Sequence, residues 1–283
     1  MISAKPSHTA QRVAIRRAAH QLWDFPKVFE DPIAVAIAGP HALEELQRSA
    51  GTEPFFSSAL RAFLVVRSRY AEDRLAAAVE GGVQQYVVLG AGLDTFAYRN
   101  PWRSAGLRVF EVDHPATQEW KRARLSDVGI AVPPDMTFAA VDFEEHSLAD
   151  GLLAAGFDRE RSAFFSWLGV TPYLSRAAFD ATVQFIAGIP PGSGVAFDYA
   201  VERSLLGPQQ RLALDAMSAR VARAGEPFQL FFDPGALARD LAHLGFTDIE
   251  DLDAEEINAR YFAGRTDGLA VSGGGHLLSA RLP

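Results

Sequence analysis

The stretch Tyr86-Val-Val-Leu-Gly-Ala-Gly-Leu-Asp94 decides the fold, because a short apolar run leads directly into a Gly-x-Gly turn. Such a run is typical of a strand buried inside a parallel sheet. Gly90 and Gly92 lack a Cβ, so the chain can turn sharply there and bring its backbone amides close to a ligand. The stretch predicts either a nucleotide-binding turn or an ordinary tight connection between a strand and a helix.

The residues after the turn narrow the choice of nucleotide. A dinucleotide site usually has a third glycine, which allows a helix to pack closely on the sheet, and Thr95 occupies that position here. Asp94 would place a negative charge beside a pyrophosphate, which is unfavourable, whereas a cationic or zwitterionic ligand tolerates it. These two residues favour S-adenosylmethionine over NAD or FAD.

Hydrophobic periodicity predicts an α/β fold. Strand-like segments recur at residues 86–89, 107–112, 137–141, 163–167, 195–199, 247–252 and 276–280. Helical spacing is found at residues 9–22, 32–37, 41–49 and 55–79, and again at 204–223 and 234–244. We therefore expect a mostly parallel seven-stranded sheet with helices on both faces and a helical N-terminal cap.

The chain shows no internal repeat, low-complexity tract or linker, so we expect residues 1–283 to form one domain. Within it, residues 1–80 are expected to form the cap and residues 81–283 the sheet core. The segment around residues 201–233 is expected to form a lid over a buried pocket for a small molecule.

Composition argues against several classes of function. The net charge of −8 argues against a continuous basic face and hence against nucleic acid as a partner. There is no cysteine, and no spacing of histidines or carboxylates suggests a metal site. The sequence starts without an apolar signal segment and lacks a run of about 18 apolar residues. We therefore expect a cytoplasmic protein that does not cross a membrane, with an oligomeric state left open.

Acidic side chains follow the second and third expected strands, at the edge where a ligand sits in an open α/β sheet. Asp113 can accept hydrogen bonds from both ribose hydroxyls of a nucleoside. Asp142 can accept from an adenine amino group, while Phe143 covers the ring. The alternative is that Asp113 and Asp142 only cap helices, where aspartate is also favoured.

Taken together, these segments resemble the leucine carboxyl methyltransferase family, within its bacterial branch. The resemblance rests on Thr9-Ala-Gln-Arg-Val-Ala14, Phe29-Glu-Asp-Pro-Ile-Ala34, Arg67-Ser-Arg-Tyr70, Val88-Leu-Gly-Ala-Gly-Leu-Asp-Thr95, Phe110-Glu-Val-Asp-His-Pro115, Asp142-Phe143, Trp167-Leu-Gly-Val-Thr-Pro-Tyr-Leu174 and Asn258-Ala-Arg-Tyr-Phe-Ala-Gly-Arg-Thr-Asp-Gly268. It implies the Rossmann-like fold of class I methyltransferases, with S-adenosyl-L-methionine as cofactor and S-adenosyl-L-homocysteine as product.

The resemblance also implies roles for single residues. Arg67 corresponds to the arginine that holds the methionine carboxylate, although a surface arginine is the alternative. The loop under the methionine and ribose corresponds to Gly90, Ala91 and Gly92. Asp113 corresponds to the ribose-binding acid, and Asp142 with Phe143 to the adenine site.

Three further positions near the site carry different expectations. His114 is expected to be a turn residue near the ribose rather than a base. Glu111 also matches the family, but it can instead point into the sheet edge and fix a neighbour. Leu168 is a departure, because many relatives carry a glutamate there that faces the methionine amine.

The expected function is S-adenosylmethionine-dependent O-methylation of a carboxylate on a small molecule. A carboxylate is already ionised at neutral pH and needs no general base, and the family precedent also favours it. The alternatives are a weak or inactive protein that binds S-adenosylmethionine or S-adenosylhomocysteine, and a nicotinamide-dependent oxidoreductase.

Candidates for the acceptor site are hydroxyl donors and cations that follow the later strands. They are Tyr173, Tyr199 and Arg203, with Arg260 and Arg265 late in the chain. The tyrosines fit ordinary packing at strand ends equally well, and the late arginines fit surface ion pairs.

Overall fold

The computed structural model describes residues 8–40, 42, 44, 48, 55–141, 147–223 and 225–283. Within them, a seven-stranded sheet has the order β3-β2-β1-β4-β5-β7-β6. Its strands are β1 (Gln85–Leu89), β2 (Arg108–Asp113), β3 (Met136–Ala140), β4 (Phe164–Trp167), β5 (Gly194–Ala200), β6 (Thr247–Leu252) and β7 (Gly275–Arg281). The first five pair in parallel, and β7 runs antiparallel to β5 and β6. The predicted mostly parallel seven-stranded sheet is confirmed.

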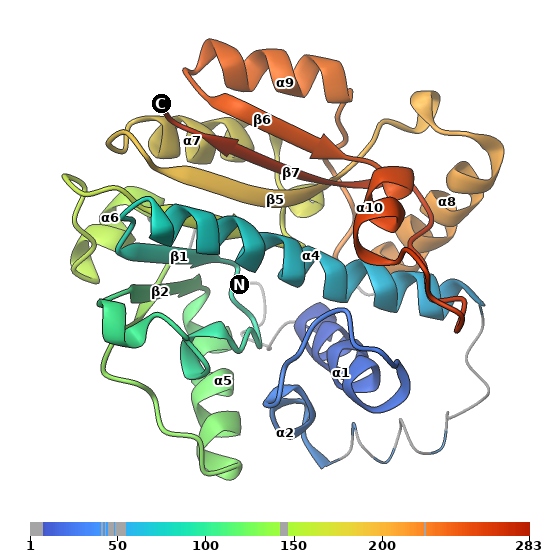
Figure 1. Ribbon diagram of the computed structural model, residues 1–283, viewed down its shortest axis with the longest axis horizontal. Coiled ribbons are helices and arrows are strands. Elements are labelled where there is room, and N and C mark those ends of the chain that lie inside the picture. Colours follow the sequence, from blue (N-terminus) through green and yellow to red (C-terminus); the bar gives the residue numbers. More distant parts are fainter. Residues whose placement is uncertain are drawn as a thin grey trace.

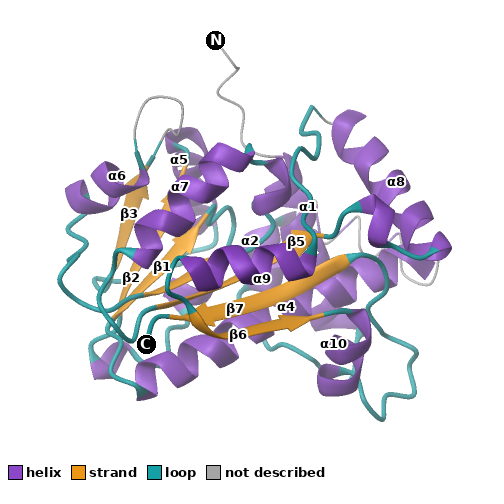
Figure 2. Cartoon of the chain, turned by 90° about the horizontal axis from the view of Figure 1, so that it is seen from above, coloured by secondary structure: helices purple, strands orange, loops and turns teal. Residues whose placement is uncertain are grey.

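Helices cover both faces of the sheet, as predicted (Figures 1 and 2). One face packs against α4 (Phe55–Glu80) and α10 (Ala254–Tyr261). The other packs against α6 (Leu148–Ala154), α7 (Arg176–Ala187) and α9 (Pro234–His243). The other α-helices in the described residues are α1 (His8–Trp23), α2 (Ala34–Ala38), α5 (Pro115–Asp127) and α8 (Pro208–Arg223). None of the described helices is long and apolar enough to cross a membrane.

Strand β1 lies at the centre of this arrangement and is buried along its whole length. Tyr86 and Val88 belong to the core on the α4 side, whereas Val87 and Leu89 belong to the core on the opposite side. Successive strand residues point to opposite faces, so the two cores need apolar side chains at all four positions from Tyr86 to Leu89. Full burial of each such side chain contributes roughly 1.5–3 kcal/mol. This packing fixes the point at which the glycine turn begins.

A helical cap precedes the sheet, as predicted. In Figure 1, α1 and α2 lie beneath α4 and beside α5. Ala14 and Ala18 of α1 share a small core with Ile37 of α2, Leu93 after the glycine turn and Leu125 of α5. Most of the helix expected at residues 41–49 lies outside the described residues.

Two helices differ from the sequence prediction. The helix expected over residues 204–223 begins only at Pro208, after a 3-10 turn at Arg203–Leu205. Proline has no backbone N–H and its fixed φ suits a first helical turn, so it starts the helix there. Helix α10 was not predicted, although Asp253 and Glu256 form a capping box at its start.

A buried ion pair joins β2 to α5. The Lys121 ammonium lies 2.6 Å from a Glu111 carboxylate oxygen, and both side chains are 1% exposed. Burial is the main cause that raises the pKa of Glu111 to about 7, while Lys121 acts to lower it. The Glu111 side chain therefore holds a neighbouring residue, Lys121. This is the structural role that the sequence offers as the alternative to cofactor binding.

Replacing Lys121 tests the importance of this pair. In the native chain the folded-state pKa of Glu111 lies above the ordinary value of 4.5, so its contribution to stability falls as the pH rises from 4.5 to about 7. Lys121→Met leaves the carboxylate without its cation, and we expect a loss of roughly 3–5 kcal/mol at about pH 8. The loss should be smaller at about pH 5, where Glu111 is protonated.

Urea unfolding at both pH values measures these differences. The double variant Glu111→Gln with Lys121→Met is the control, because it removes both charges and should recover much of the stability at the higher pH. Equal losses for the single variant at the two pH values would contradict an ionised Glu111 in the folded native protein.

Candidate functional site

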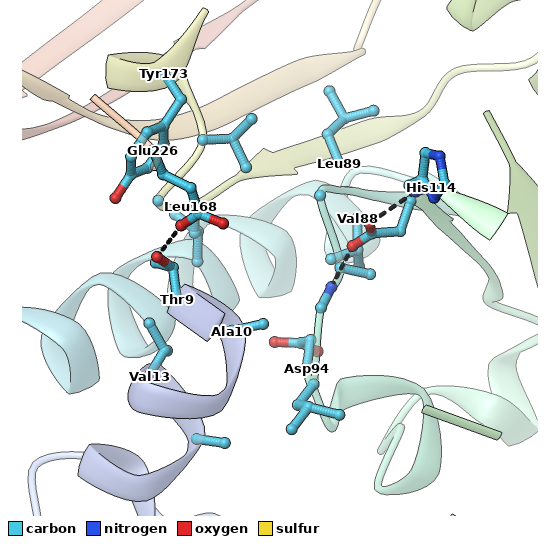
Figure 3. Close-up of a pocket in the computed structure, with 18 of the residues that line it drawn as sticks. Thr9, Ala10, Val13, Val88, Leu89, Asp94, His114, Leu168, Tyr173 and Glu226 are labelled. Atoms are coloured by element: carbon cyan, nitrogen blue, oxygen red, sulfur yellow. Dashed lines mark hydrogen bonds between the residues drawn. The ribbon is translucent and has the colours of Figure 1, made fainter. Parts of the chain in front are cut away.

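A cavity of about 480 Å³ opens at the carboxyl ends of β1 and β4. Its walls come from α1, α4, the glycine turn, the end of β2, the turn after β4 and the segment before α9. The lining includes Thr9, Ala10, Val13, Ala14, Arg17, Arg67, Ser68, Val88–Asp94, Asp113, His114, Leu168–Val170, Tyr173, Gly225–Pro227 and Gln229. Figure 3 shows His114 at one end of the cavity and Tyr173, Leu168 and Glu226 at the other.

The glycine turn forms the cavity floor. Gly90 and Gly92 have φ values of +66° and +48°, a backbone conformation that other residues rarely adopt. A Cβ on Gly90 would lie 2.3 Å from Cγ2 of Val170, so glycine also allows the two turns to approach closely. The amides of Gly90 and Ala91 both donate to the Val112 carbonyl, at 2.9 and 3.0 Å. These bonds hold the turn against the end of β2.

Arg17 of α1 ties the cap to this turn. Its guanidinium donates to Asp31 at 2.5 Å and to the hydroxyl of Thr95 at 2.9 Å, and it lies 3.3 Å from Asp94. Burial acts to raise the pKa of Asp94, but Arg17, Lys121 and Arg99 hold it below its ordinary value. The negative charge that the sequence places beside the turn is therefore already paired with a cation.

Asp113 and His114 form the end of the cavity beyond β2. Asp113 accepts hydrogen bonds from the amides of Gly92, at 2.6 Å, and His114, at 2.7 Å. Burial raises the pKa of Asp113, and these two bonds oppose the rise. His114 is the N-cap of α5, because its Nδ1 accepts from the Ala116 amide at 3.1 Å. The residue that caps the helix is therefore His114 and not Asp113.

Arg67 of α4 lies at the opposite end of the cavity, buried at 7% exposure. Its Nη1 donates to Asp198 of β5 at 3.1 Å, and the other oxygen of Asp198 accepts from the Gly169 amide at 2.6 Å. A Cβ on Gly169 would lie 2.7 Å from both terminal guanidinium nitrogens. The alternative of a surface arginine is wrong, and Arg67 with Asp198 fixes the turn after β4.

The segment before α9 closes another side of the cavity. The backbone N–H of Gln229 donates to the Pro172 carbonyl at 2.6 Å. The side-chain amide of Gln229 donates to the Tyr173 carbonyl at 2.9 Å. The Thr9 hydroxyl of α1 donates to the Glu226 carboxylate, as Figure 3 shows. Part of the segment expected to form a lid, residues 201–233, thus contacts both α1 and the turn after β4.

The structure brings most of the residues expected at the cofactor site to one cavity. Arg67, Gly90, Ala91, Gly92, Asp113 and His114 all line it, together with Leu168 and Tyr173. Asp142 and Phe143, the expected adenine site, lie outside the described residues.

The other acceptor candidates do not line this cavity. Tyr199 is buried at 1% exposure and donates to Asp251 at 2.5 Å, which uses its hydroxyl in a contact between strands. Arg203 is exposed and paired with Asp215 at 2.8 Å. The late arginines form ion pairs of their own, Arg260 with Glu250 and Arg265 with Asp267.

Several lining residues were not identified as site residues from the sequence. The clearest are Ala10, Val13, Glu226 and Gln229, which reach the cavity from α1 and from the segment before α9. These segments are separated from the glycine turn by long stretches of chain, and no local pattern marks their contact. The Thr9–Ala14 block matches the family and could have drawn attention to α1, but the match does not show that this helix borders the cavity.

The sheet order and its glycine turn are those of class I S-adenosylmethionine-dependent methyltransferases. Two crystal structures share the fold. One, from Thermobifida fusca YX, has a TM-score of 0.60 at 18% identity and covers 99% of this chain and 96% of that one. The other, a DUF574 family protein from Streptomyces avermitilis MA-4680, has a TM-score of 0.60 at 17% identity with 100% of both chains covered.

Sequence comparison places the chain more narrowly. The leucine carboxyl methyltransferase family matches residues 10–187. The Bacillus subtilis (strain 168) protein named "Putative S-adenosyl-L-methionine-dependent methyltransferase YktD" is 31% identical over 280 residues, which cover 91% of this chain and 92% of that protein. The chain belongs to the leucine carboxyl methyltransferase family and is an S-adenosylmethionine-dependent methyltransferase.

Asp198 supplies a test of how the site is held together. Asp198→Ala removes the carboxylate that pairs with Arg67 and leaves the Gly169 amide without its acceptor. Loss of one member of a buried ion pair costs about 3–5 kcal/mol, and we expect a loss of that size in urea unfolding. Asp198→Asn keeps an oxygen for the Gly169 amide and should lose less. Unchanged stability in Asp198→Ala would show that the pair does not support the turn.

Proposed function

We propose that S-adenosylmethionine occupies the cavity described above, with the Gly90–Gly92 turn beneath its ribose and methionine. Two observations support this assignment. The cavity volume, about 480 Å³, lies within the range of roughly 300–1,000 Å³ usual for small-ligand sites. The turn is built so closely against Val170 that a side chain on Gly90 would not fit. When bound, the cofactor supplies an electrophilic methyl group on a sulfonium.

The residues at the two ends of the cavity suit the two ends of the cofactor. Each carboxylate oxygen has more than one acceptor position, so Asp113 can accept from ribose hydroxyls while it holds the Gly92 amide. Arg67 offers further N–H donors besides the one directed at Asp198, and a guanidinium matches the methionine carboxylate. Asp142 and Phe143 remain predictions for adenine.

The acceptor is a carboxylate, and the state of Tyr173 carries this part of the proposal. A phenol with the ordinary pKa of about 10 is already protonated at neutral pH, and burial raises the pKa of Tyr173 further, to about 12, so its hydroxyl is a hydrogen-bond donor and not a base. Among the described residues, His114 is the histidine that lines the cavity. It lies at the end opposite Tyr173 and caps α5. An acceptor that is already ionised suits such a site, since it needs donors rather than a base.

In the proposed reaction, a carboxylate oxygen of the acceptor forms a bond to the methyl carbon as the carbon–sulfur bond breaks. The products are a methyl ester and S-adenosylhomocysteine, and no proton moves. Tyr173 donates to the carboxylate, and the cavity walls hold the oxygen in line with the breaking bond.

The acceptor is a small molecule. Helix α1 and the residues around Glu226 enclose the cavity from two sides and meet through the bond from Thr9. The proposal treats residues 1–283 as one methyltransferase domain, in which the cap and the 201–233 segment serve the same pocket.

Substitution of Gly90 tests whether the cavity binds the cofactor. Gly90→Ala forces a Cβ into Val170, and we expect S-adenosylhomocysteine to bind at least about tenfold more weakly in calorimetric titration. Gly129→Ala is the matched control, since Gly129 has a similar φ of +70° with nothing within 4 Å of the added Cβ. The control should lose stability but keep its affinity. Equal affinities for Gly90→Ala and native protein would place the ligand elsewhere.

The chemistry of the product tests the acceptor class. Native protein is incubated with S-adenosylmethionine that carries a labelled methyl group and with a panel of small carboxylic acids and their matching alcohols and phenols. We expect transfer to carboxylic acids, with the label released as methanol on mild alkaline hydrolysis because the product is an ester. A labelled product that survives alkali would contradict carboxylate methylation and leave cofactor binding unaffected.

A further inference from the structure

Leu168 leaves a gap in the expected cofactor site. The family resemblance implies that an acid at this position faces the methionine amine, and Leu168 lines the cavity without a charge. An ammonium group removed from water without a partner is costly, so another acceptor has to serve it. In the described part of the cavity, the carboxylates are those of Asp94, Asp113 and Glu226.

Position separates these three carboxylates. Asp113 accepts from the amide of His114, and Figure 3 shows His114 at the end of the cavity away from Leu168 and Tyr173. Asp94 is paired with Arg17 and accepts from the Phe96 amide at 2.8 Å. Glu226 is at the same end as Leu168 and Tyr173 in Figure 3.

Glu226 and Arg67 line the same cavity, and Tyr173 lies near both of them. Thr9 donates to its carboxylate, and Tyr173 lies in the electrostatic field of both charges, because Glu226 acts to raise the pKa of Tyr173 and Arg67 acts to lower it. The Gln229 amide, three residues along, is bonded to Pro172 at 2.6 Å. Glu226 is therefore held in place against the turn that carries Leu168.

Among the described residues, this end of the cavity is thus lined by one cation, Arg67, and one anion, Glu226. An α-amino acid group has the complementary pair, a carboxylate and an ammonium. We propose that Glu226 accepts a hydrogen bond from the α-ammonium of S-adenosylmethionine, in place of an acid at position 168, while Arg67 contacts the α-carboxylate. The inference rests on the proposed occupancy of the cavity. A carboxylate has about four acceptor positions, so the contact with Thr9 is compatible with this role.

Two ligands separate this role from a general effect on the pocket. S-adenosylhomocysteine carries the amino acid group, whereas 5′-methylthioadenosine has the same nucleoside and thioether without it. Glu226→Gln keeps the size of the side chain and an oxygen for Thr9 but removes the charge. We expect it to bind S-adenosylhomocysteine about tenfold to a hundredfold more weakly and 5′-methylthioadenosine with unchanged affinity, both by calorimetric titration.

A second substitution provides a rescue. Leu168→Glu, added to Glu226→Gln, returns an acid to the position that many relatives use, and we expect affinity for S-adenosylhomocysteine to recover most of the loss. Leu168→Gln in the same background is the matched control and should recover little. Thermal unfolding of each variant verifies that it is folded before titration.

The outcomes separate this inference from the proposed function. If native protein binds both ligands and Glu226→Gln binds both as tightly, the assignment of Glu226 is overturned while the cofactor pocket stands. Equal weakening of both ligands by Glu226→Gln also overturns it, because the residue would then act on the pocket as a whole. If native protein binds neither ligand, the proposed pocket fails and the assignment of Glu226 fails with it.

Discussion

One buried guanidinium, that of Arg17, holds the site together. A charge with 5% exposure is destabilising unless it is paired, and Arg17 reaches the carboxylates of Asp31 and Asp94 and the hydroxyl of Thr95. Its partners lie on the loop before α2 and on the glycine turn, while Arg17 itself is part of α1. The cap therefore has a fixed position above the floor of the cavity, and Ala10 and Val13 of the same helix become part of the wall.

Strand β5 shows how alternation along a strand decides which side chain reaches a site. Phe197 and Tyr199 point into the core that contains α7 and α9, whereas Ala196 belongs to the core on the α4 side. Asp198 has the same parity as Ala196 and therefore meets Arg67 of α4. Tyr199 is directed away from the cavity for the same reason, and among the described residues Tyr173 is the phenol that lines it.

The parts predicted well from the sequence are those that depend on local pattern. Strand β1, the glycine turn and the acid at the end of β2 follow from a buried strand and from the edge at which parallel strands end. The faces of β5 could not be assigned, because both are buried and the partner that accommodates the Asp198 carboxylate, Arg67, is 131 residues away. Glu226 could not be placed either, since its partner Thr9 is 217 residues away and no periodicity records that contact.

Thr95 shows why this turn suits a smaller ligand than a dinucleotide. In a dinucleotide site a glycine here lets a helix pack tightly and carry the pyrophosphate on its N-terminus. Thr95 is fully buried, and its hydroxyl donates to Asp31 at 2.8 Å while it accepts from Arg17. A glycine at position 95 would remove one hydrogen-bond partner from the buried Asp31 carboxylate and one from the Arg17 guanidinium. The turn thus supports the cap in place of a phosphate-binding helix, and the cap in turn encloses the end where Arg67 and Glu226 lie.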